Sequence, residues 1–458
     1  MNKAFKAIWS DVRQSFVTTS EIQSSHGKRS KASVSLSVAT VLLATSGLVS
    51  AAYVETGTLG DKASWETAEY NYNWGLGAMN ASSAYALGFY GQNTTTGVMD
   101  SGAWLGNPDL DTPRITATHV TGVYGSSGNR YPQSIYATIQ KGVVPTAAEG
   151  QPFTEGEEFD VKGDYTLGLN DAHGTQVTGV IGAERNGEYG HGVAFKANVV
   201  VGNTGATDNN NYGPFQDYNY YFKGYKALAD AVNAGNGEYR GGMVNNSYGT
   251  NTKIYSSGGH RLTPDEMSEL LAGSGNYDRA SAAYAVTFSG DYSFLGLNDV
   301  PGADQYSTNP SAFEWEYMYF KLKYGDKPSF LDGAYDAVKG TNVILSWAAG
   351  NQDRGTPYLK GLYPYFHPEA EKNWLNAVGV MQTRGDNDQY MQATYCKAGL
   401  AKWWSMSGPT AYPGIGTTYV TTDLENGRLT TTGFNGTSAS DPQISGAFTV
   451  LPEFDSGF

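Results

Sequence analysis

Residues 436–447 read GTSASDPQISGA, and the expectations for the rest of the chain start from this stretch. A nucleophilic serine needs its hydroxyl at the N-terminus of a helix, where backbone N–H groups and the helix dipole stabilise an oxyanion. Gly436 permits a tight turn just before Ser438. Asp441 is a good N-cap and Pro442 is favourable at the first helical position, so we expect a helix to begin there. The plainer alternative is an ordinary Ser/Thr-rich turn before a helix.

Two upstream segments carry polar residues in positions suited to chemistry. Asp100 follows the short run 97–99 and precedes Ser-Gly, which suits a carboxylate at the C-terminal end of a strand. His173 precedes apolar positions within 177–181 that fall on one face of a helix beginning near the histidine. Taken alone, Asp100 reads as a turn residue and His173 as a solvated capping residue. Together with Ser438 they supply an orienting carboxylate, a general base and a nucleophile, in the order Asp, His, Ser.

From about residue 78 to 450 the chain resembles the subtilisin-like serine proteases, the subtilases. The resemblance rests on the three motifs in this order and on four further segments, namely 191–201, 244–249 (VNNSYG), 346–351 (SWAAGN) and 405–414. It implies an α/β, subtilisin-like fold of three layers with a mostly parallel central sheet. It also implies that the side chain of Asn351 donates to the oxyanion. By the same resemblance, substrate backbone would be bound by Ser247, Tyr248, Gly249, Ala349 and Gly350.

The residues around Asn351 give that role independent support. The apolar run 341–348 suits a buried parallel strand, and 331–339 suits a helix before it. An amide side chain just beyond such a strand points into the cleft at the C-terminal edge of the sheet. An asparagine in a Gly-Asn turn is the alternative.

The N-terminal 51 residues predict export. Residues 32–52 are apolar with interspersed Ser and Thr, follow a basic cluster, and end in small residues suited to cleavage, as in a secretory signal. A membrane anchor is disfavoured because the strongly apolar part is shorter than the roughly 20 residues that a span needs. Residues 1–28 resemble the extended signal region of type V secreted proteins of Gram-negative bacteria, the autotransporters. Phe5, Ile8 and Trp9 with nearby basic residues also allow a basic amphipathic helix.

Composition excludes other functions. The chain has 458 residues, 40% of them hydrophobic, which suffices for a large buried core. Its net charge of −14 gives no attraction to phosphate, so we expect no nucleic-acid partner. Cys396 is the single cysteine, so neither an intrachain disulfide nor a cysteine-rich metal site can form. We expect an acidic product exported across the inner membrane, to the periplasm, the cell surface or the medium.

The predicted organisation has three parts. Residues 1–51 form the extended signal peptide, 52–77 an N-terminal linker, and 78–458 the catalytic domain. Insertions near 103–168 and 251–330 read as surface loops, with a lid or a partner surface as the alternative for the second.

The helical pattern is lost after Leu451, before Pro452, so we expect the fold to be incomplete at its C-terminal end, as in a truncated or frameshifted product. The autotransporter resemblance implies an outer-membrane β-barrel in a full-length form, and this sequence does not include one.

The leading function is an exported serine endopeptidase that acts on protein or peptide substrates and meets the secretion machinery during export. The alternatives are a catalytically crippled fragment, a surface-binding passenger, and a serine esterase. No metal is predicted in the catalytic site; structural calcium is possible at 208–211 or 385–388, although such polar loops are usually turns. Asp441 adds a second carboxylate near the nucleophile, which would either raise the pKa of His173 or disfavour the oxyanion. If this charge matters, Asp441→Ala is expected to raise kcat.

Overall fold

The computed structural model describes thirteen stretches of the chain. They are residues 5–10, 15–20, 57–129, 152–164, 172–187, 190–204, 217–237, 241–248, 327–351, 355–383, 386–410, 417–423 and 428–454. The chain divides into two compact units, residues 1–52 and residues 53–458.

In the first unit, β1 (Phe5–Ser10) and β2 (Ser15–Ser20) pair as an antiparallel hairpin in which Ile8 lies opposite Val17. The amphipathic helix that periodicity allowed for these residues is therefore wrong. Consecutive β-branched residues at 17–19 favour a strand, and pairing with them holds residues 5–10 extended.

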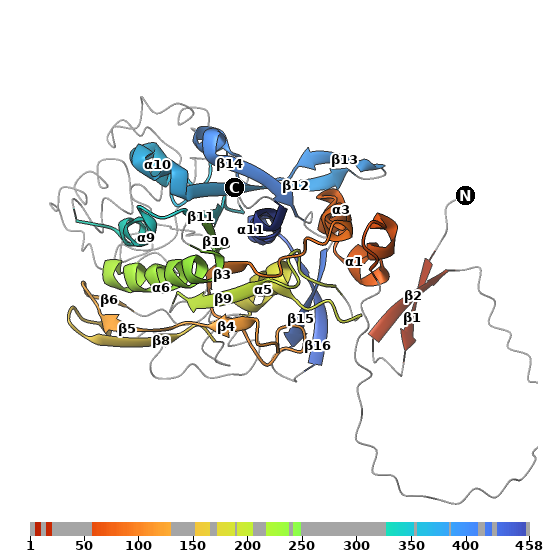
Figure 1. Ribbon diagram of the computed structural model, residues 1–458, viewed down its shortest axis with the longest axis horizontal. Coiled ribbons are helices and arrows are strands. Elements are labelled where there is room, and N and C mark those ends of the chain that lie inside the picture. The colour runs from red at the N-terminus through yellow and green to blue at the C-terminus, as the bar shows by residue number, and fades with distance from the viewer. Residues whose placement is uncertain are drawn as a thin grey trace, which may run out of the picture. The chain divides into compact units, whose positions relative to one another are not determined.

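The second unit is organised around an eight-stranded sheet (Figure 1). Its main path has the order β13-β12-β11-β10-β3-β9-β4, and β14 also pairs with β12. All pairings are parallel except β12 with β13. The strands are β3 (Thr95–Asp100), β4 (Ile115–Ala117), β9 (Asn198–Asn203), β10 (Gly242–Asn246), β11 (Val343–Ala348), β12 (Trp374–Thr383), β13 (Asp386–Gln392) and β14 (Ser405–Pro409).

Helices cover both faces of this sheet. One face packs against α5 (His173–Gly182) and α11 (Thr437–Phe454), and the other against α6 (Tyr218–Asn236), which packs in turn on α9 (Phe330–Val338). Successive strand residues point to opposite faces. In β3, Val98 packs with residues of α5 and Met99 with residues of α6. The prediction of a three-layer α/β fold with a mostly parallel sheet is confirmed.

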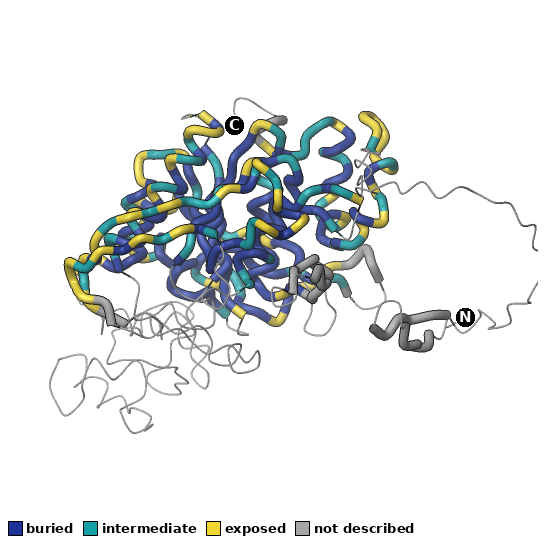
Figure 2. The backbone as a smooth tube through the Cα atoms, turned by 90° about the horizontal axis from the view of Figure 1, so that it is seen from below, coloured by how far each residue is buried: buried dark blue, intermediate teal, exposed yellow. Residues whose placement is uncertain are grey.

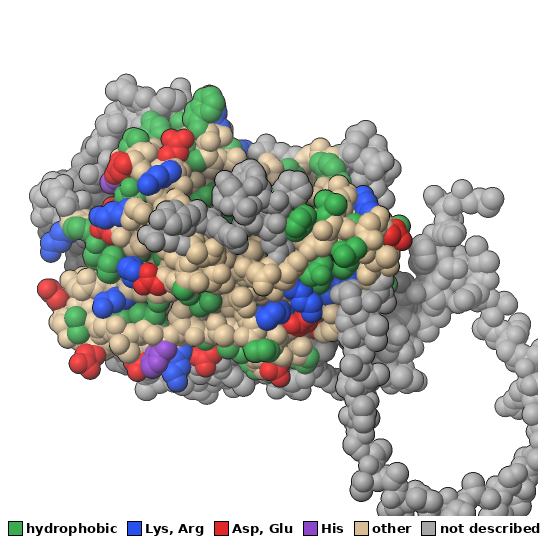
Figure 3. All heavy atoms as spheres, viewed as in Figure 1, with side chains coloured by type: hydrophobic (Ala, Val, Ile, Leu, Met, Phe, Trp, Pro, Cys, Tyr) green, Lys and Arg blue, Asp and Glu red, His purple; other side chains and the backbone are tan. Residues whose placement is uncertain are grey.

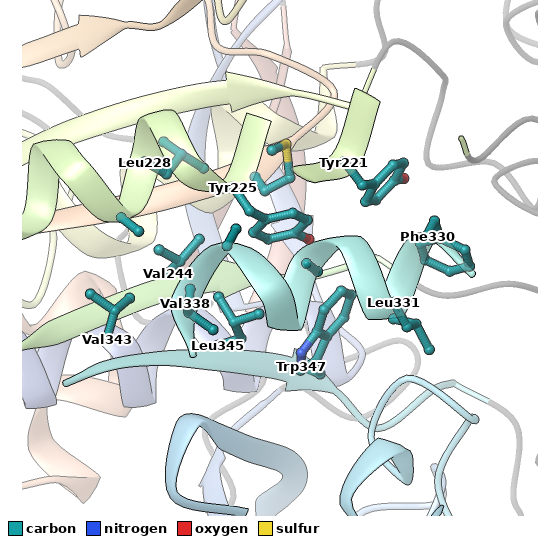
Figure 4. Close-up of a cluster of buried hydrophobic side chains, with 14 of the residues drawn as sticks. Tyr221, Tyr225, Leu228, Val244, Phe330, Leu331, Val338, Val343, Leu345 and Trp347 are labelled. Carbon is teal, nitrogen blue, oxygen red and sulfur yellow. The ribbon is translucent and has the colours of Figure 1, made fainter. Parts of the chain in front are cut away.

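The largest core cluster lies between the sheet and α6 and α9 (Figure 4). Trp347 of β11, Tyr225 of α6 and Leu331 of α9 are at most 1% exposed and belong to it. Figure 2 shows that the buried backbone lies in the interior of the described residues and the exposed backbone at their periphery. Strand β3 is buried along its whole length although it begins Thr-Thr-Gly, because helices cover it on both sides. The strands therefore hold their C-terminal ends, and the side chains there, on a rigid base.

Residues 57–86 are helical and pack onto the same unit. They form η1 (Lys62–Trp65), α1 (Ala68–Tyr72), α2 (Trp74–Ala78) and α3 (Ala81–Ala86). Trp65, Tyr70 and Tyr85 are buried in a cluster with Phe195. The described part of the predicted linker 52–77 thus belongs to the compact unit.

The remaining elements are hairpins and short helices. They are the pairs β5 (His119–Val123) with β8 (Glu158–Lys162), β6 (Gly128–Asn129) with β7 (Pro152–Phe153) and β15 (Thr417–Asp423) with β16 (Arg428–Phe434), and the helices α10 (Tyr363–Phe366), η4 (Pro368–Asn373) and η5 (Gly399–Trp404). The predicted insertion at 103–168 supplies β4 to β8. Most of the second insertion, 251–326, lies outside the described residues.

Helix α11 differs from the prediction at both ends. It begins at Thr437, so Asp441 lies inside the helix and is not its N-cap. The positive φ of Gly436, 81°, turns the chain directly into the helix, which moves the start upstream of the acidic residue. The helix also continues past Pro452 to Phe454, because a proline in the last turn removes only one helical hydrogen bond.

Two further features of the described residues are the distribution of charge on their surface and the apolar character of their helices. On the face shown in Figure 3, basic and acidic side chains are interspersed. Within the described part of the chain, no helix is both long and apolar enough for a membrane span.

Candidate active site

Strand β3 delivers Asp100 to the C-terminal edge of the sheet. The side chain is fully buried, and its Oδ1 accepts hydrogen bonds from the backbone N–H of Ser101 at 2.8 Å and from Nδ1 of His173 at 3.0 Å. A buried carboxylate that accepts a hydrogen bond from Nδ1 fixes the orientation and the tautomer of the imidazole ring. A proton that the ring takes up then binds at Nε2. The structure thus brings together two of the three predicted catalytic residues.

Helix α5 positions His173 by its close approach to the loop after β3. The backbone N–H of Gly174 donates to Oγ of Ser101 at 2.9 Å. A Cβ at Gly174 would lie 2.2 Å from the carbonyl oxygen of Gly102, so only glycine fits there. The ring of Phe434 meets the His173 ring edge to face, with centroids 5.3 Å apart. Both contacts hold the imidazole beside Asp100.

Replacing Gly174 with alanine is expected to lower the free energy of unfolding by about 1–3 kcal/mol, because the added methyl group forces α5 away from the loop. Gly179→Ala is the matched control on the same helix, since a Cβ there meets nothing within 4 Å. It is expected to be neutral or to stabilise by up to about 1 kcal/mol through helix propensity. Urea unfolding of both variants measures the difference, and equal stabilities would contradict the close approach.

Ser438 is the second residue of α11, as an oxyanion-forming nucleophile requires. It is 7% exposed, and its hydroxyl donates to the carbonyl oxygen of Ser247 at 2.5 Å. The hydroxyl is therefore bonded to the end of β10 and not to His173. The structure places Ser438 in the first turn of α11, and the hydrogen bond from serine to histidine that a triad uses is not formed.

Asn351 lies beyond the end of β11 and is tied to the start of α11. Its Oδ1 accepts from the backbone N–H and the hydroxyl of Thr437, at 2.8 and 2.9 Å. The Thr437 hydroxyl oxygen in turn accepts from the backbone N–H of Gly350 at 2.9 Å. Gly436 allows this contact, because a Cβ there would lie 2.7 Å from Oδ1 of Asn351. With Oδ1 used as the acceptor, the amide nitrogen is the end of this side chain that can donate.

The residues predicted to bind substrate backbone follow β10 and β11. Ser247 and Tyr248 are buried, and the Tyr248 hydroxyl lies 2.7 Å from that of Tyr225 inside the main core. Ala349 and Gly350 follow β11, the second with a φ of 114°. The side chains of Ser247, Tyr248 and Ala349 are buried. The backbone groups of Ala349 pair with Ala377 and Tyr358, and those of Gly350 with Thr437 and Cys396, so both residues fix the chain at the end of β11. Gly249 lies outside the described residues.

Asp441 is fully buried one turn beyond Ser438. Its carboxylate accepts from the hydroxyl of Ser346 and from the backbone N–H of Asn246, the latter at 3.3 Å. Burial raises the pKa of Asp441 to about 7; these hydrogen bonds lower it in part, and the nearby charge of Asp100 raises it further. Near neutral pH this side chain therefore exists in both charge states.

The other histidines have structural surroundings. His191 is fully buried among Tyr70, Tyr85 and Phe195, and burial lowers its pKa to about 3, so it stays neutral. His119 pairs with Asp160 at 2.6 Å on an exposed hairpin, and His367 stacks on Tyr363. His26 and His260 lie outside the described residues.

The structure offers little for a metal. Among the described residues, no three His, Cys, Asp or Glu side chains gather as a metal site. Of the predicted calcium positions, 208–211 lies outside the described residues, and Asp386–Asp388 belong to strand β13 and not to a loop. Calcium binding at either position stays a prediction.

A groove of about 910 Å³ lies between the β5–β8 hairpin and the first turns of α6. Its lining includes Phe159, Tyr218 and Phe222 and none of the predicted catalytic residues. The candidate site therefore lies at the strand ends and the start of α11, and this groove is separate from it.

Sequence reasoning missed two residues of the site. Thr437 links Asn351 to α11. Its position between Gly436 and Ser438 could have marked it in the sequence as part of the site. Phe434 packs on His173 from a separate hairpin, and no local pattern in the sequence points to that contact.

Comparisons with known proteins follow the same division of the chain. The family model described as "Subtilase family" matches residues 91–456. The model described as "Extended Signal Peptide of Type V secretion system" matches residues 1–50.

Curated relatives match a smaller part of the chain. An extracellular serine protease of Serratia marcescens is 31% identical over 163 residues, which are 36% of this chain and 12% of the relative. Serotype-specific antigen 1 of Mannheimia haemolytica is 32% identical over 117 residues, 25% of this chain and 12% of the relative. The matched part thus spans 12% of the length of these two relatives.

Solved structures align over more of the chain. The nisin leader peptidase from Lactococcus lactis is 14% identical, with 84% of this chain and 85% of that chain covered and a TM-score of 0.42. Fervidolysin from Fervidobacterium pennivorans is also 14% identical, with 85% and 41% covered and the same TM-score.

Proposed function

Because the chain belongs to the subtilase family, and carries an extended signal peptide of type V secretion, we propose that it is an exported serine endopeptidase. The observation that carries the proposal is the 3.0 Å hydrogen bond between Nδ1 of His173 and the fully buried Asp100. Burying a carboxylate beside an imidazole costs free energy of desolvation, unless a partner compensates the charge or the charge has a function. Stabilising the imidazolium that forms during acyl transfer is such a function.

In the proposed reaction, Oγ of Ser438 attacks the carbonyl carbon of the scissile peptide bond. The hydroxyl proton passes to Nε2 of His173, while Asp100 holds the ring through Nδ1. The oxyanion that forms accepts from the amide of Asn351 and from the backbone N–H of Ser438 at the start of α11. Before the attack, the Ser438 hydroxyl must turn away from the Ser247 carbonyl, to which it donates at rest.

The proton on His173 then goes to the leaving amine, the C–N bond breaks, and an acyl ester remains on Ser438. Water then gives a proton to Nε2 of His173 and attacks the ester. His173 returns the proton to Oγ of Ser438 as the bond between Oγ and the acyl carbon breaks, which releases the acid product. Peptide substrate would lie beside the ends of β10 and β11, at Ser247, Ala349 and Gly350, which the resemblance to the subtilases assigns to substrate binding. The segment 244–249, which resembles the strand that binds substrate backbone in subtilases, favours a peptidase over an esterase.

Labelling with a fluorophosphonate probe tests the proposal. Ser438 Oγ should form a bond to phosphorus as fluoride leaves, and mass spectrometry of the digested protein should locate the label. We expect labelling of the purified chain and its loss in His173→Ala. Cleavage of fluorescent casein then separates a peptidase from an esterase. A folded chain that neither labels nor cleaves would instead support a surface-binding passenger.

A further inference from the structure

Ser438 and Asp441 bind adjacent residues at the sheet edge and share Ser247 as a partner. Ser438 donates to the carbonyl of Ser247, and Asp441 accepts from the backbone N–H of Asn246. Oδ2 of Asp441 also lies 3.5 Å from the hydroxyl of Ser247. The two side chains come from one turn of α11, so the Asp441 carboxylate is built into the segment that sets the resting position of the nucleophile.

The carboxylate meets only neutral partners. Its direct contacts are the hydroxyls of Ser346 and Ser247 and the N–H of Asn246. The elements packed against α11 are α5, β3, β10, β11, β12 and β14, and their titratable side chains are Asp100 and His173. On α11 itself the other titratable residue is Glu453. None of these elements supplies a lysine or arginine to compensate an ionised Asp441.

We propose that Asp441 is a positioning residue for Ser438, and that its ionisation holds the nucleophile in the resting orientation. An ionised carboxylate accepts hydrogen bonds about twice as strong as those of its neutral form. In that form it fixes Asn246 and Ser247, and the Ser247 carbonyl competes with His173 for the Ser438 hydroxyl. The neutral form holds the segment less tightly and releases the hydroxyl. A second anion near the site also opposes the developing oxyanion, which acts in the same direction.

This inference rests on the proposed function and deepens it. Because the pKa of Asp441 lies near neutrality, reactivity should fall as the pH rises through about 7. Near pH 8 roughly one molecule in ten keeps Asp441 neutral. Asp441→Asn has no charge to gain, so at pH 8 it should react about tenfold faster than the unmodified chain. The two should react at similar rates near pH 5.5, where Asp441 of the unmodified chain is mostly neutral.

The experiment measures the rate constant for labelling of Ser438 by a fluorophosphonate from pH 5 to 9, with the full chain. Ser445→Ala is the matched control: its hydroxyl accepts from the Asn245 side chain at 3.2 Å, so it removes a neutral bond between α11 and β10. We expect Ser445→Ala to keep the fall in rate above pH 7 and Asp441→Asn to lose it. The same fall in Asp441→Asn, or a loss of labelling at every pH, would overturn the positioning role.

Thermal unfolding, followed by circular dichroism, gives a second readout that needs no activity. The pKa of Asp441 is raised on folding, so its contribution to stability is complete below about pH 4 and is lost as the pH rises through about 7. The unmodified chain should therefore lose more Tm between pH 5 and 8 than Asp441→Asn does. If every variant unfolds cooperatively but none labels at any pH, the proposed function is wrong, and the positioning role is wrong with it. If labelling occurs but the two Tm profiles coincide, the proposed function stands and the titration of Asp441 near pH 7 is contradicted.

Discussion

Replacing Ser438 with alanine is expected to lower peptide hydrolysis by about 10⁶-fold, the order of loss when a serine nucleophile is removed from a triad. The reason is chemical: the hydroxyl is the only atom of this side chain that can form the acyl ester. The fold should remain, because the lost hydrogen bond to Ser247 is a single contact worth about 1 kcal/mol. Hydrolysis of fluorescent casein, measured with unfolding by urea on the same samples, checks both statements.

Ser440→Ala is the matched control for this substitution. Ser440 lies on the same turn of α11 and is fully buried, and its hydroxyl has no hydrogen-bond partner in the structure. Removing it should leave hydrolysis within about twofold and stability unchanged or slightly higher, because an unsatisfied buried hydroxyl is itself costly. Comparable activity in the two variants would show that Ser438 is not the nucleophile.

Asn351→Ala is expected to lower kcat by about 10²–10³-fold and to change KM little, because a donor to the oxyanion acts in the transition state. The side chain is prepared for this role in the resting state. Its Oδ1 is held by two bonds from Thr437, so little reorganisation is needed when negative charge develops. Steady-state kinetics on one chromogenic peptide separates kcat from KM.

Asn351→Asp separates donation from packing. The carboxylate can keep both bonds from Thr437, but it cannot donate to an oxyanion and adds a negative charge beside it. We therefore expect a loss in kcat at least as large as that of the alanine variant, with smaller effects on stability. If the aspartate variant retained most of the activity, Asn351 would act by holding α11 and not by binding the oxyanion.

The sequence predicted helices and strands whose apolar residues follow a clear periodic pattern. It did not predict features that depend on packing between segments distant in the sequence. Helix α5 was predicted to begin near His173, and it does, because the apolar spacing at 177–181 is a local signal. Strand β3 begins Thr-Thr-Gly, which is not an apolar pattern, and it is buried because α5 and α6 cover it from opposite sides. The position of Asp441 in α11 was misread as a cap, because the segments that bury it, β10 and β11, are distant in sequence.

In the candidate site, residue types predicted which side chains could take part in catalysis. They could not predict how those side chains are oriented. The pairing of Asp100 with His173 followed from their types and order. The bond from Ser438 to Ser247 spans 191 residues, and no local pattern encodes the rotamer that forms it. The roles of Thr437 and Asp441 likewise depend on which strand ends lie beside α11, and that is a property of the sheet order.

The hydrogen bond from Gln443 of α11 to Asn73, at 3.0 Å, joins residues 370 positions apart. Such contacts form late in folding, because closing a long loop costs chain entropy that only later packing recovers. Helix α11 can therefore complete its packing only when the segment around Asn73, near the start of the domain, is also available to fold. If Ser438 is the nucleophile, as proposed, a nascent chain that ends before α11 would be inactive although Asp100 and His173 have already been synthesised.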